Sequence, residues 1–200
     1  MGRHAPVGIR ARVSNPLLRL ARADDFSAIA EITNHYIRTT AIHFAAHDIR
    51  ADELAEQHRV GGDVHPWLVA EVDGTVRGYA KASRWRERDA YRFTCETGVY
   101  VEHRWLGRGL GRALMQRLIR LLGDQGYRSI VAGVALPNDP SVRLHEALGF
   151  RSVGVVRDAG FKFEKWHDVG FWQLRLREDA APPRLLTVTE AFARGQPNAT

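Results

Sequence analysis

The sequence predicts an α/β protein in which a mixed sheet is flanked by helices. Short β-branched and aromatic runs alternate with helical stripes of apolar residues in the order β-α-α-β-β-β-α-β-α-β-β. With 200 residues, 44% of them hydrophobic, the chain can bury one sizeable core. A glycine-rich turn at residues 107–111 separates a predicted strand from a predicted helix. Together these observations indicate one α/β domain.

Periodicity and residue propensity place the individual elements. The expected strands are 17–22, 66–72, 75–85, 91–101, 129–135, 151–156 and 168–176, and the expected helices are 24–37, 51–60, 110–122 and 140–149. The polar segments 82–90 and 158–167 are predicted to be loops.

Local signals mark where several of these elements begin and end. Asp24 and Asp25 suit the N-cap of the first helix. The pair Asp73-Gly74 is typical of the tight turn of a β-hairpin. Pro140 and Gly149 suit the start and the end of a short helix. The third helix is indicated by an apolar stripe made of Leu110, Leu114, Leu118, Leu121 and Leu122.

The two ends of the chain differ from its middle in composition. Residues 1–16 are rich in Arg, Gly and Pro and are predicted to be a disordered leader. Residues 17–177 form the expected domain, and residues 178–200 an Ala- and Pro-rich tail, of which 185–192 has enough apolar residues to dock.

Composition excludes several classes of protein. One cysteine, Cys95, permits no internal disulfide, and no Cys/His cluster has zinc-site spacing, so we expect no metal and a reducing cytoplasm. Neither a signal peptide nor a run of about 20 apolar residues is visible, so no membrane partner is expected. The net charge of +6 suits a nucleic acid or an anionic small ligand, but no nucleic-acid-binding motif accompanies it.

The glycine-rich turn suits an anion. A strand that ends in Gly-X-Gly-X-Gly and opens a helix offers unpaired backbone N–H groups and the positive end of the helix dipole. A turn without a ligand is the alternative. Arg112 and Ala113 follow Gly111 where a nucleotide-hydrolysing P-loop would carry Lys and Ser or Thr. The glycine spacing also differs from that of a dinucleotide fold.

Longer motifs resemble one family. Arg104 to Gly109 fits the Arg/Gln-X-X-Gly-X-Gly pyrophosphate turn of the GNAT N-acetyltransferases. LPNDPSVRLHEALGF and WHDVGFWQ resemble the phosphinothricin acetyltransferase branch, in a likeness that spans about residues 17–176. The resemblance implies a GNAT fold, with a mostly antiparallel sheet splayed at its centre. It also implies an acetyl-CoA-dependent enzyme that acetylates the amino group of phosphinothricin, methionine sulfoximine or methionine sulfone, with resistance and a homodimer as family traits.

The resemblance also assigns a binding site for acetyl-CoA. It places the pantetheine arm on the backbone of the preceding strand and the pyrophosphate on the glycine turn. The implied residues are Val99, Tyr100, Val101, Gly107, Arg108, Gly109, Leu110, Gly111, Arg112 and Asn138. A helix cap is the alternative role of Asn138.

Two residues are candidates for proton transfer. Glu96, flanked by apolar and small residues, would act as general base, and its alternative is a carboxylate that faces solvent or pairs with an arginine. His145 would protonate the departing thiolate, with Tyr100 as a weaker substitute and a structural helix histidine as the alternative reading. Strand alternation directs Cys95 away from Glu96, which argues against a covalent cysteine.

The substrate side follows from the same resemblance. It implies Arg86, Glu87, Arg88, Tyr91, Glu96, Thr97 and Gly98. An arginine can hold a carboxylate or phosphinate with two hydrogen bonds. Phe44, Lys162 and Trp166 are further candidates for lining the pocket, either within one chain or from a partner subunit.

Two other functions stay open from the sequence. The same chemistry can serve a protein N-terminus or an aminoglycoside. A non-enzymatic nucleic-acid-binding module on this fold is the third reading, and it would show steep salt dependence.

Overall fold

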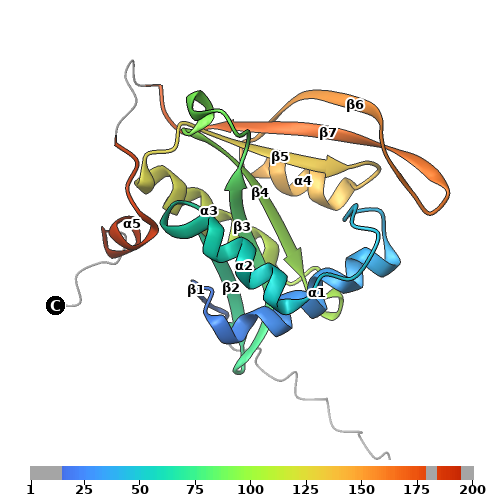
Figure 1. Cartoon of the computed structure of the whole chain (residues 1–200), viewed down its shortest axis with the longest axis horizontal. Helices are drawn as coiled ribbons and strands as arrows, with labels where there is room; N and C mark the ends of the chain where they lie inside the picture. The colour runs from blue at the N-terminus through green and yellow to red at the C-terminus, as the bar shows by residue number, and fades with distance from the viewer. Residues whose placement is uncertain (1–14, 179–183, 195–200) are drawn as a thin grey trace, which may run out of the picture.

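The computed structural model describes residues 15–178 and 184–194. Most of the predicted leader therefore lies outside the described residues. Figure 1 shows one twisted sheet with helices on both faces. Its strands are β1 Leu17–Leu20, β2 Trp67–Val72, β3 Thr75–Arg84, β4 Thr94–Val101, β5 Ser129–Ala135, β6 Arg151–Lys162 and β7 Lys165–Arg175.

The strands follow the order β1-β2-β3-β4-β5-β7-β6, so β6 forms one edge. Neighbouring strands run antiparallel, except that β4 and β5 are parallel. The predicted mixed, mostly antiparallel sheet is confirmed.

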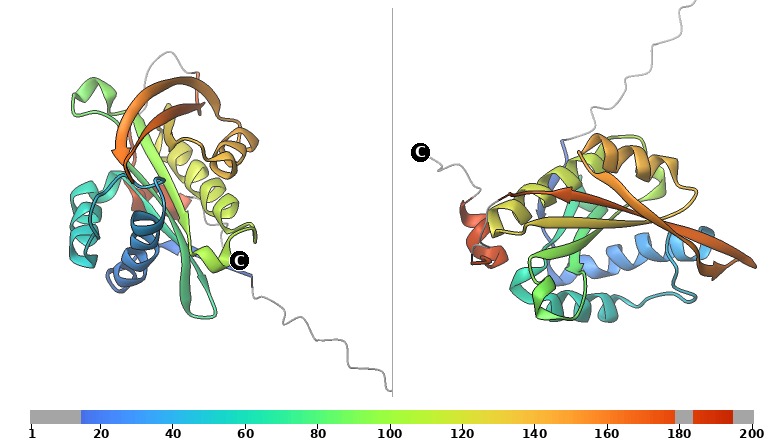
Figure 2. Two further views of the ribbon diagram at one scale, coloured as in Figure 1. Left: turned by 90° about the vertical axis from the view of Figure 1, so that its right-hand side faces the viewer. Right: turned by 90° about the horizontal axis from the view of Figure 1, so that it is seen from above.

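Helices cover the sheet from two sides (Figure 2). They are α1 Phe26–Thr39, α2 Ala51–Gly61, α3 Leu110–Gln125, α4 Asp139–Ala147 and α5 Val188–Arg194. The left view of Figure 2 has α1 and α2 on one side and α3 and α4 on the other. Strand alternation supplies both cores: in β2, for example, Trp67 and Val69 pack toward α1, while Leu68 and Ala70 pack toward α3. A sheet that is buried on both faces needs apolar residues at nearly every position, and β2 has them.

The sheet opens at its centre. The parallel register between β4 and β5 covers only Thr94–Glu96 and Ser129–Val131. Beyond it β4 continues along β3, while β5 continues along β7. Figure 1 shows the two strands diverging. Since the backbone groups on the facing edges of both strands are then free of sheet pairing, this splay can accept an extended ligand.

The strand expected at 91–101 starts later than predicted. Tyr91 ends a 3-10 helix, Asp89–Tyr91, whose turns use the amides that a strand would need. The N–H of Tyr91 donates to the carbonyl oxygen of Arg88, and the N–H of Arg92 donates to the carbonyl oxygen of Asp89, both at 3.0 Å. The loop expected at 82–90 likewise begins only after Arg84, where β3 ends.

The prediction of a loop at 158–167 is wrong. These residues extend β6 and β7 into a long hairpin whose turn is Phe163 and Glu164. Both turn residues have positive φ, 50° and 57°. Asn and Gly are the usual signals for such a turn, and neither is present. A register shift between Val156 and Gly160 also interrupts the alternation that would have marked the strand.

Part of the predicted tail packs on the core. Leu186, Val188 and Ala191 are buried in the cluster beneath α3. The N–H of Leu186 also bonds to the carbonyl of Gln125 at 2.8 Å. The segment 185–192 therefore docks on the core, as its apolar residues allowed.

Candidate active site

The glycine turn leads into an uncapped helix start. Gly107 and Gly109 have φ of 73° and 83°, the left-handed conformation that glycine adopts without strain. No side chain caps α3 among the described residues, and the first helical bond runs from Ala113 N–H to Gly109 C=O at 3.0 Å. The amides of residues 110–112 therefore have no partner within the helix. Since no atom lies within 4 Å of an added Cβ at Gly107 or Gly109, a ligand has room there.

A cavity of about 440 Å³ joins this turn to the splay between β4 and β5. Its walls come from β4 (97–101), β5 (133–135), the glycine turn, the start of α3, and α4 with the loop before it. Tyr36 and Ile42 close it on the side of α1. The structure thus brings together the residues predicted to bind acetyl-CoA, except that Arg108 is not in the cavity wall.

Arginines surround the turn in different ways. Arg112 lines the cavity. The guanidinium carbon atoms of Arg108 and Arg77 lie 4.4 and 5.0 Å from the ring centre of Trp105, so this indole carries two cations beside the turn. The positive charge near the turn therefore comes from Arg112 in the cavity wall and from Arg108 and Arg77 beside Trp105.

His145 lies buried on α4, 3% exposed, and lines the cavity. Its Nδ1 is 2.8 Å from the carbonyl oxygen of Ser141, and because a carbonyl only accepts, Nδ1 carries the proton. Burial lowers the pKa of His145, so the ring is neutral at rest. Its Nε2 then presents a lone pair and has no partner among the described residues. A ring in this state accepts a proton more readily than it donates one.

Two further polar groups line the same wall. Asn138 caps α4, because its Oδ1 accepts the N–H of Ser141 at 3.3 Å, as the alternative reading held. The hydroxyl of Thr97 is buried with no partner among residues 15–178 and 184–194. A buried polar group without a partner is costly, so the Thr97 hydroxyl and His145 Nε2 both favour a ligand that supplies one.

Glu96 lies half-buried where β4 and β5 diverge. A Cβ placed on Gly133 would be 3.1 Å from its Oε1, so the carboxylate lies against β5 beside a residue that lines the cavity, although Glu96 itself is not in the cavity wall. Burial raises the pKa of Glu96, while the charges of Arg86 and Lys81 oppose that rise. Lys81 is the residue that sequence reasoning missed. It lies opposite Gly98 in the β3–β4 register, a relation that only the paired strands reveal.

Tyr100 follows on the same face of β4 as Glu96. Its ring stacks on Tyr79 at 5.4 Å and lies 5.5 Å from the ring of Tyr36. Burial raises its pKa to about 12, so the hydroxyl keeps its proton at neutral pH. Next to it, the Val101 carbonyl accepts the hydroxyl of Tyr36 at 2.6 Å, so this backbone group already has one partner.

Only some of the residues predicted to bind substrate lie near Glu96 or in the cavity wall. Arg86 is close enough to Glu96 to affect its pKa, and its guanidinium stacks on Trp85 at 4.3 Å. Glu87 pairs with Arg84 instead, and its side chain is 92% exposed. Arg88 and Tyr91 are exposed and do not line the cavity.

Phe44, Lys162 and Trp166 also lie outside the cavity wall. Trp166 is 63% exposed, near the turn of the β6–β7 hairpin. Lys162 and Phe44 join that hairpin to the segment after α1 within a single chain.

Cys95 points to the opposite face from Glu96. It is fully buried in the core beneath α3, and burial raises the pKa of its thiol well above the normal range. A thiolate is therefore disfavoured there.

An open sheet with an uncapped, anion-binding helix start at the opening is the architecture of acetyl-CoA-dependent N-acetyltransferases. Residues 22–150 match the sequence model of the acetyltransferase (GNAT) family. The chain belongs to this family, and the resemblance seen in its sequence is confirmed.

Similar proteins narrow the branch. A phosphinothricin N-acetyltransferase of Streptomyces viridochromogenes is 48% identical over 167 residues, 84% of this chain and 91% of the relative. An L-methionine sulfoximine/L-methionine sulfone acetyltransferase of Salmonella typhimurium is 40% identical over 168 residues, 82% of this chain and 97% of the relative. The structure of a phosphinothricin acetyltransferase from Sinorhizobium meliloti in complex with acetyl-CoA has a TM-score of 0.81 at 32% identity and covers 84% of this chain and 94% of its own.

Acetyl-CoA fits the observed cavity. The free amides at the start of α3 suit its pyrophosphate, and the unpartnered Thr97 hydroxyl and His145 Nε2 suit the polar groups of its arm. No group of three or more His, Cys, Asp or Glu residues in the described chain is arranged to hold a metal ion. None of the described helices is long and apolar enough to cross a bilayer.

Proposed function

We propose that this chain acetylates the amino group of a small amino-acid-like substrate, such as phosphinothricin, methionine sulfoximine or methionine sulfone, with Glu96 as general base. One observation carries the proposal: the Glu96 carboxylate is half-buried at the splay, within electrostatic reach of Arg86 and Lys81. The names of the relatives support the substrate class.

Glu96 prepares the amine. An amino acid brings an ammonium group, which must lose a proton before its nitrogen can attack a carbonyl. Burial gives Glu96 a raised pKa, which makes it a better proton acceptor than an exposed carboxylate. The positive charges of Arg86 and Lys81 favour its ionised form, which is the form that accepts a proton.

Acetyl-CoA supplies an acetyl group that is activated as a thioester. Residues 107–112 would hold its pyrophosphate, and Val99, Tyr100 and Val101 would orient its arm along the free edge of β4. As the C–N bond forms and the C–S bond breaks, the departing sulfur needs a proton. Tyr100 keeps its proton at neutral pH, whereas His145 must first gain one. We therefore favour Tyr100 as the donor and give His145 Nε2 the role of an acceptor that binds the cofactor.

The acceptor side is cationic. Arg86 and Lys81 can bind the carboxylate or phosphinate of an amino-acid-like substrate, which would leave its amine beside Glu96. An acetylated amine no longer carries the charge of an amino-acid analogue, so we infer that the activity confers resistance to such inhibitors.

The test replaces the base. Glu96→Gln keeps the shape of the side chain but cannot take a proton, so we expect kcat to fall by about 10²- to 10⁴-fold. Acetyl-CoA binding, measured by calorimetry, should not change. Glu31→Gln, on the exposed surface of α1, is the matched control. Activity is assayed as thiol release with phosphinothricin, methionine sulfoximine and methionine sulfone, beside a peptide and an aminoglycoside. Full activity of Glu96→Gln would remove the base assignment, and acetylation of only the peptide or antibiotic would remove the substrate class.

We also infer a homodimer that works in the cytoplasm. The edge strand β6 and the hairpin that it forms with β7 expose a set of apolar side chains: Val153, Val155, Val156, Phe161, Phe163 and Trp166. An exposed apolar edge favours association with a second copy. The single buried thiol of the described chain supports a reducing compartment.

Sedimentation tests the dimer. Val155→Lys would bury an unpaired charge in the proposed interface and should weaken association by about tenfold or more. Val60→Lys on α2, where the native side chain is 73% exposed, is the control. A wild-type chain that sediments as a monomer would contradict the proposal.

A further inference from the structure

The β6–β7 hairpin carries a lysine that bonds to the first half of the chain. Lys162 Nζ donates to the carbonyl oxygens of Ile37 and His43, each at 2.6 Å. Ile37 lies in the last turn of α1, where carbonyls lack helical partners and form the negative end of the helix dipole. The hydrogen bonds and the dipole therefore favour the ammonium group there, while burial lowers the pKa of Lys162 and so acts against the charge.

An apolar contact supports the same junction. The ring of Phe44 lies directly on Gly160, where an added Cβ would be 2.4 Å from Phe44 Cε2. His167, the cross-strand partner of Gly160, lies 6.2 Å from the Phe44 ring centre and donates from Nε2 to the Lys162 carbonyl at 2.9 Å. Only glycine at 160 allows Phe44 to sit this close to the strand.

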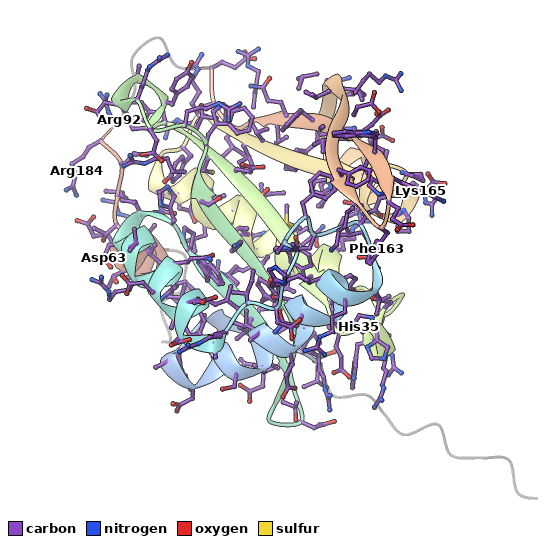
Figure 3. The ribbon with its side chains drawn as sticks, turned by 45° about the vertical axis from the view of Figure 1, so that its right-hand side comes forward. His35, Asp63, Arg92, Phe163, Lys165 and Arg184 are labelled. Atoms are coloured by element: carbon purple, nitrogen blue, oxygen red, sulfur yellow. The ribbon has the colours of Figure 1, made fainter. Side chains whose placement is uncertain are left out.

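The far end of the segment is anchored independently. Asn34 on α1 donates to the Ile49 carbonyl at 3.0 Å and accepts the Ile49 N–H at 2.8 Å. Residues 40–48 are therefore held by α1 at both ends and by the hairpin between them. In Figure 1 the end of the hairpin bends toward this segment, and Figure 3 labels Phe163 and Lys165 in that part of the hairpin.

The segment borders the cavity on the face that carries Glu96. Ile42 lines the cavity beside Tyr36 and Tyr100. The His43 ring centre is 5.9 Å from that of Tyr100. Burial, with the nearby charges of Lys81 and Lys162, lowers the pKa of His43 to about 4, so it is neutral at working pH. The glycine turn and α3 lie on the other face, so this end of the cavity belongs to the acceptor.

We propose that the hydrogen bonds of Lys162 and the contact of Phe44 with Gly160, together called the clasp, hold the β6–β7 hairpin against residues 40–46. The clasp thereby positions Ile42 and His43 as a wall of the acceptor end of the cavity. Lys162 is a positioning residue, because it acts through the segment that it holds. The inference rests on the proposed function, since it assigns this end of the cavity to the amino substrate.

The experiment compares two variants with a matched control. Lys162→Met removes the ammonium group and keeps the length of the side chain. Gly160→Ala displaces Phe44 and leaves every charge in place. Lys165→Met is the control, since Lys165 faces Lys162 across the same turn and is exposed. Each is studied by hydrogen–deuterium exchange without ligand and by kinetics with acetyl-CoA and methionine sulfoximine.

We expect exchange at residues 41–46 to accelerate about tenfold or more in Lys162→Met and Gly160→Ala, because two hydrogen bonds from a charged donor, or the Phe44 contact, are lost. The KM for methionine sulfoximine should rise about tenfold, while kcat and the KM for acetyl-CoA stay within about twofold. Lys165→Met should match the wild type.

The outcomes separate the clasp from the proposed function. Unchanged exchange in Lys162→Met overturns the clasp, and an equal change in Lys165→Met overturns it too, because net charge would then be the cause. Faster exchange with an unchanged KM for methionine sulfoximine overturns the acceptor wall. A wild type inactive on amino-acid analogues removes the proposed function, whereas the exchange result still tests the clasp.

Discussion

Replacing Gly109 by alanine tests whether the turn before α3 binds acetyl-CoA. Gly109 has φ of 83°, and an added Cβ would meet no atom within 4 Å. The methyl group therefore clashes with nothing in the protein. An alanine in this left-handed conformation costs about 1–2 kcal/mol, which lowers the Tm of a chain of this size by about 2–8 °C.

The second effect depends on the ligand. Because Gly109 lines the cavity, the methyl group would occupy space beside the free amides of α3. At a concentration of 100 times Kd, a ligand stabilises a protein by about 2.7 kcal/mol. A tenfold weaker Kd removes about 1.3 kcal/mol of this, so the Tm increase on adding acetyl-CoA should shrink by about 3–5 °C.

Gly74→Ala separates strain from binding. Gly74 has φ of 74° and equally open surroundings, but it lies in the β2–β3 turn, away from the cavity. Both variants should lose similar stability without ligand in thermal scans, and only Gly109→Ala should respond less to acetyl-CoA. The reasoning is refuted if acetyl-CoA raises the Tm of both variants equally.

Three further predictions concern the splay. Because burial raises the pKa of Glu96, kcat should fall as the pH falls through that raised pKa. Lys81→Met should move this decline to higher pH, since the Lys81 charge lowers the same pKa. An identical pH–rate profile for the variant would contradict the electrostatic contact. Cys95→Ala should keep its kcat, since the thiol is buried on the opposite face, and a loss of about a hundredfold or more at unchanged stability would argue for covalent chemistry. Gly133→Ala should lower kcat without removing an ionisable group, because the Cβ of the alanine would lie 3.1 Å from the Glu96 carboxylate and 3.4 Å from the Phe171 ring. A variant with the kcat of the wild type would show that the carboxylate is not confined there.

Local patterns were enough to predict most elements of the fold. The stripe of leucines gave α3, and Asp73-Gly74 gave the β2–β3 turn, whose residues have φ of 50° and 74°. The hairpin turn at Phe163 and Glu164 was missed because its residues adopt positive φ without the usual signal. That conformation is imposed by strand pairing along β6 and β7, which is a tertiary contact.

The candidate site was predictable where its signals are contiguous. The glycine turn and the strand before it are local, and all but one of the residues predicted there to bind the cofactor line the cavity. The residues predicted to bind substrate are gathered less well, since Glu87, Arg88 and Tyr91 are exposed. Lys81, which affects the pKa of Glu96, was overlooked. No local pattern marks a lysine on one strand as the neighbour of a glutamate on the next.

The sequence alone determined the order of the elements, the glycine turn and the family, because each depends on short spacings or on long uninterrupted motifs. The tertiary structure decided which groups are buried, charged or without a partner. It buried His145 and left its Nε2 without a partner among the described residues, and it brought Lys162 to the carbonyl oxygen of Ile37 across 125 positions of sequence. Burial and such contacts depend on how strands and helices pack together, and that packing sets the pKa values and the shape of the cavity.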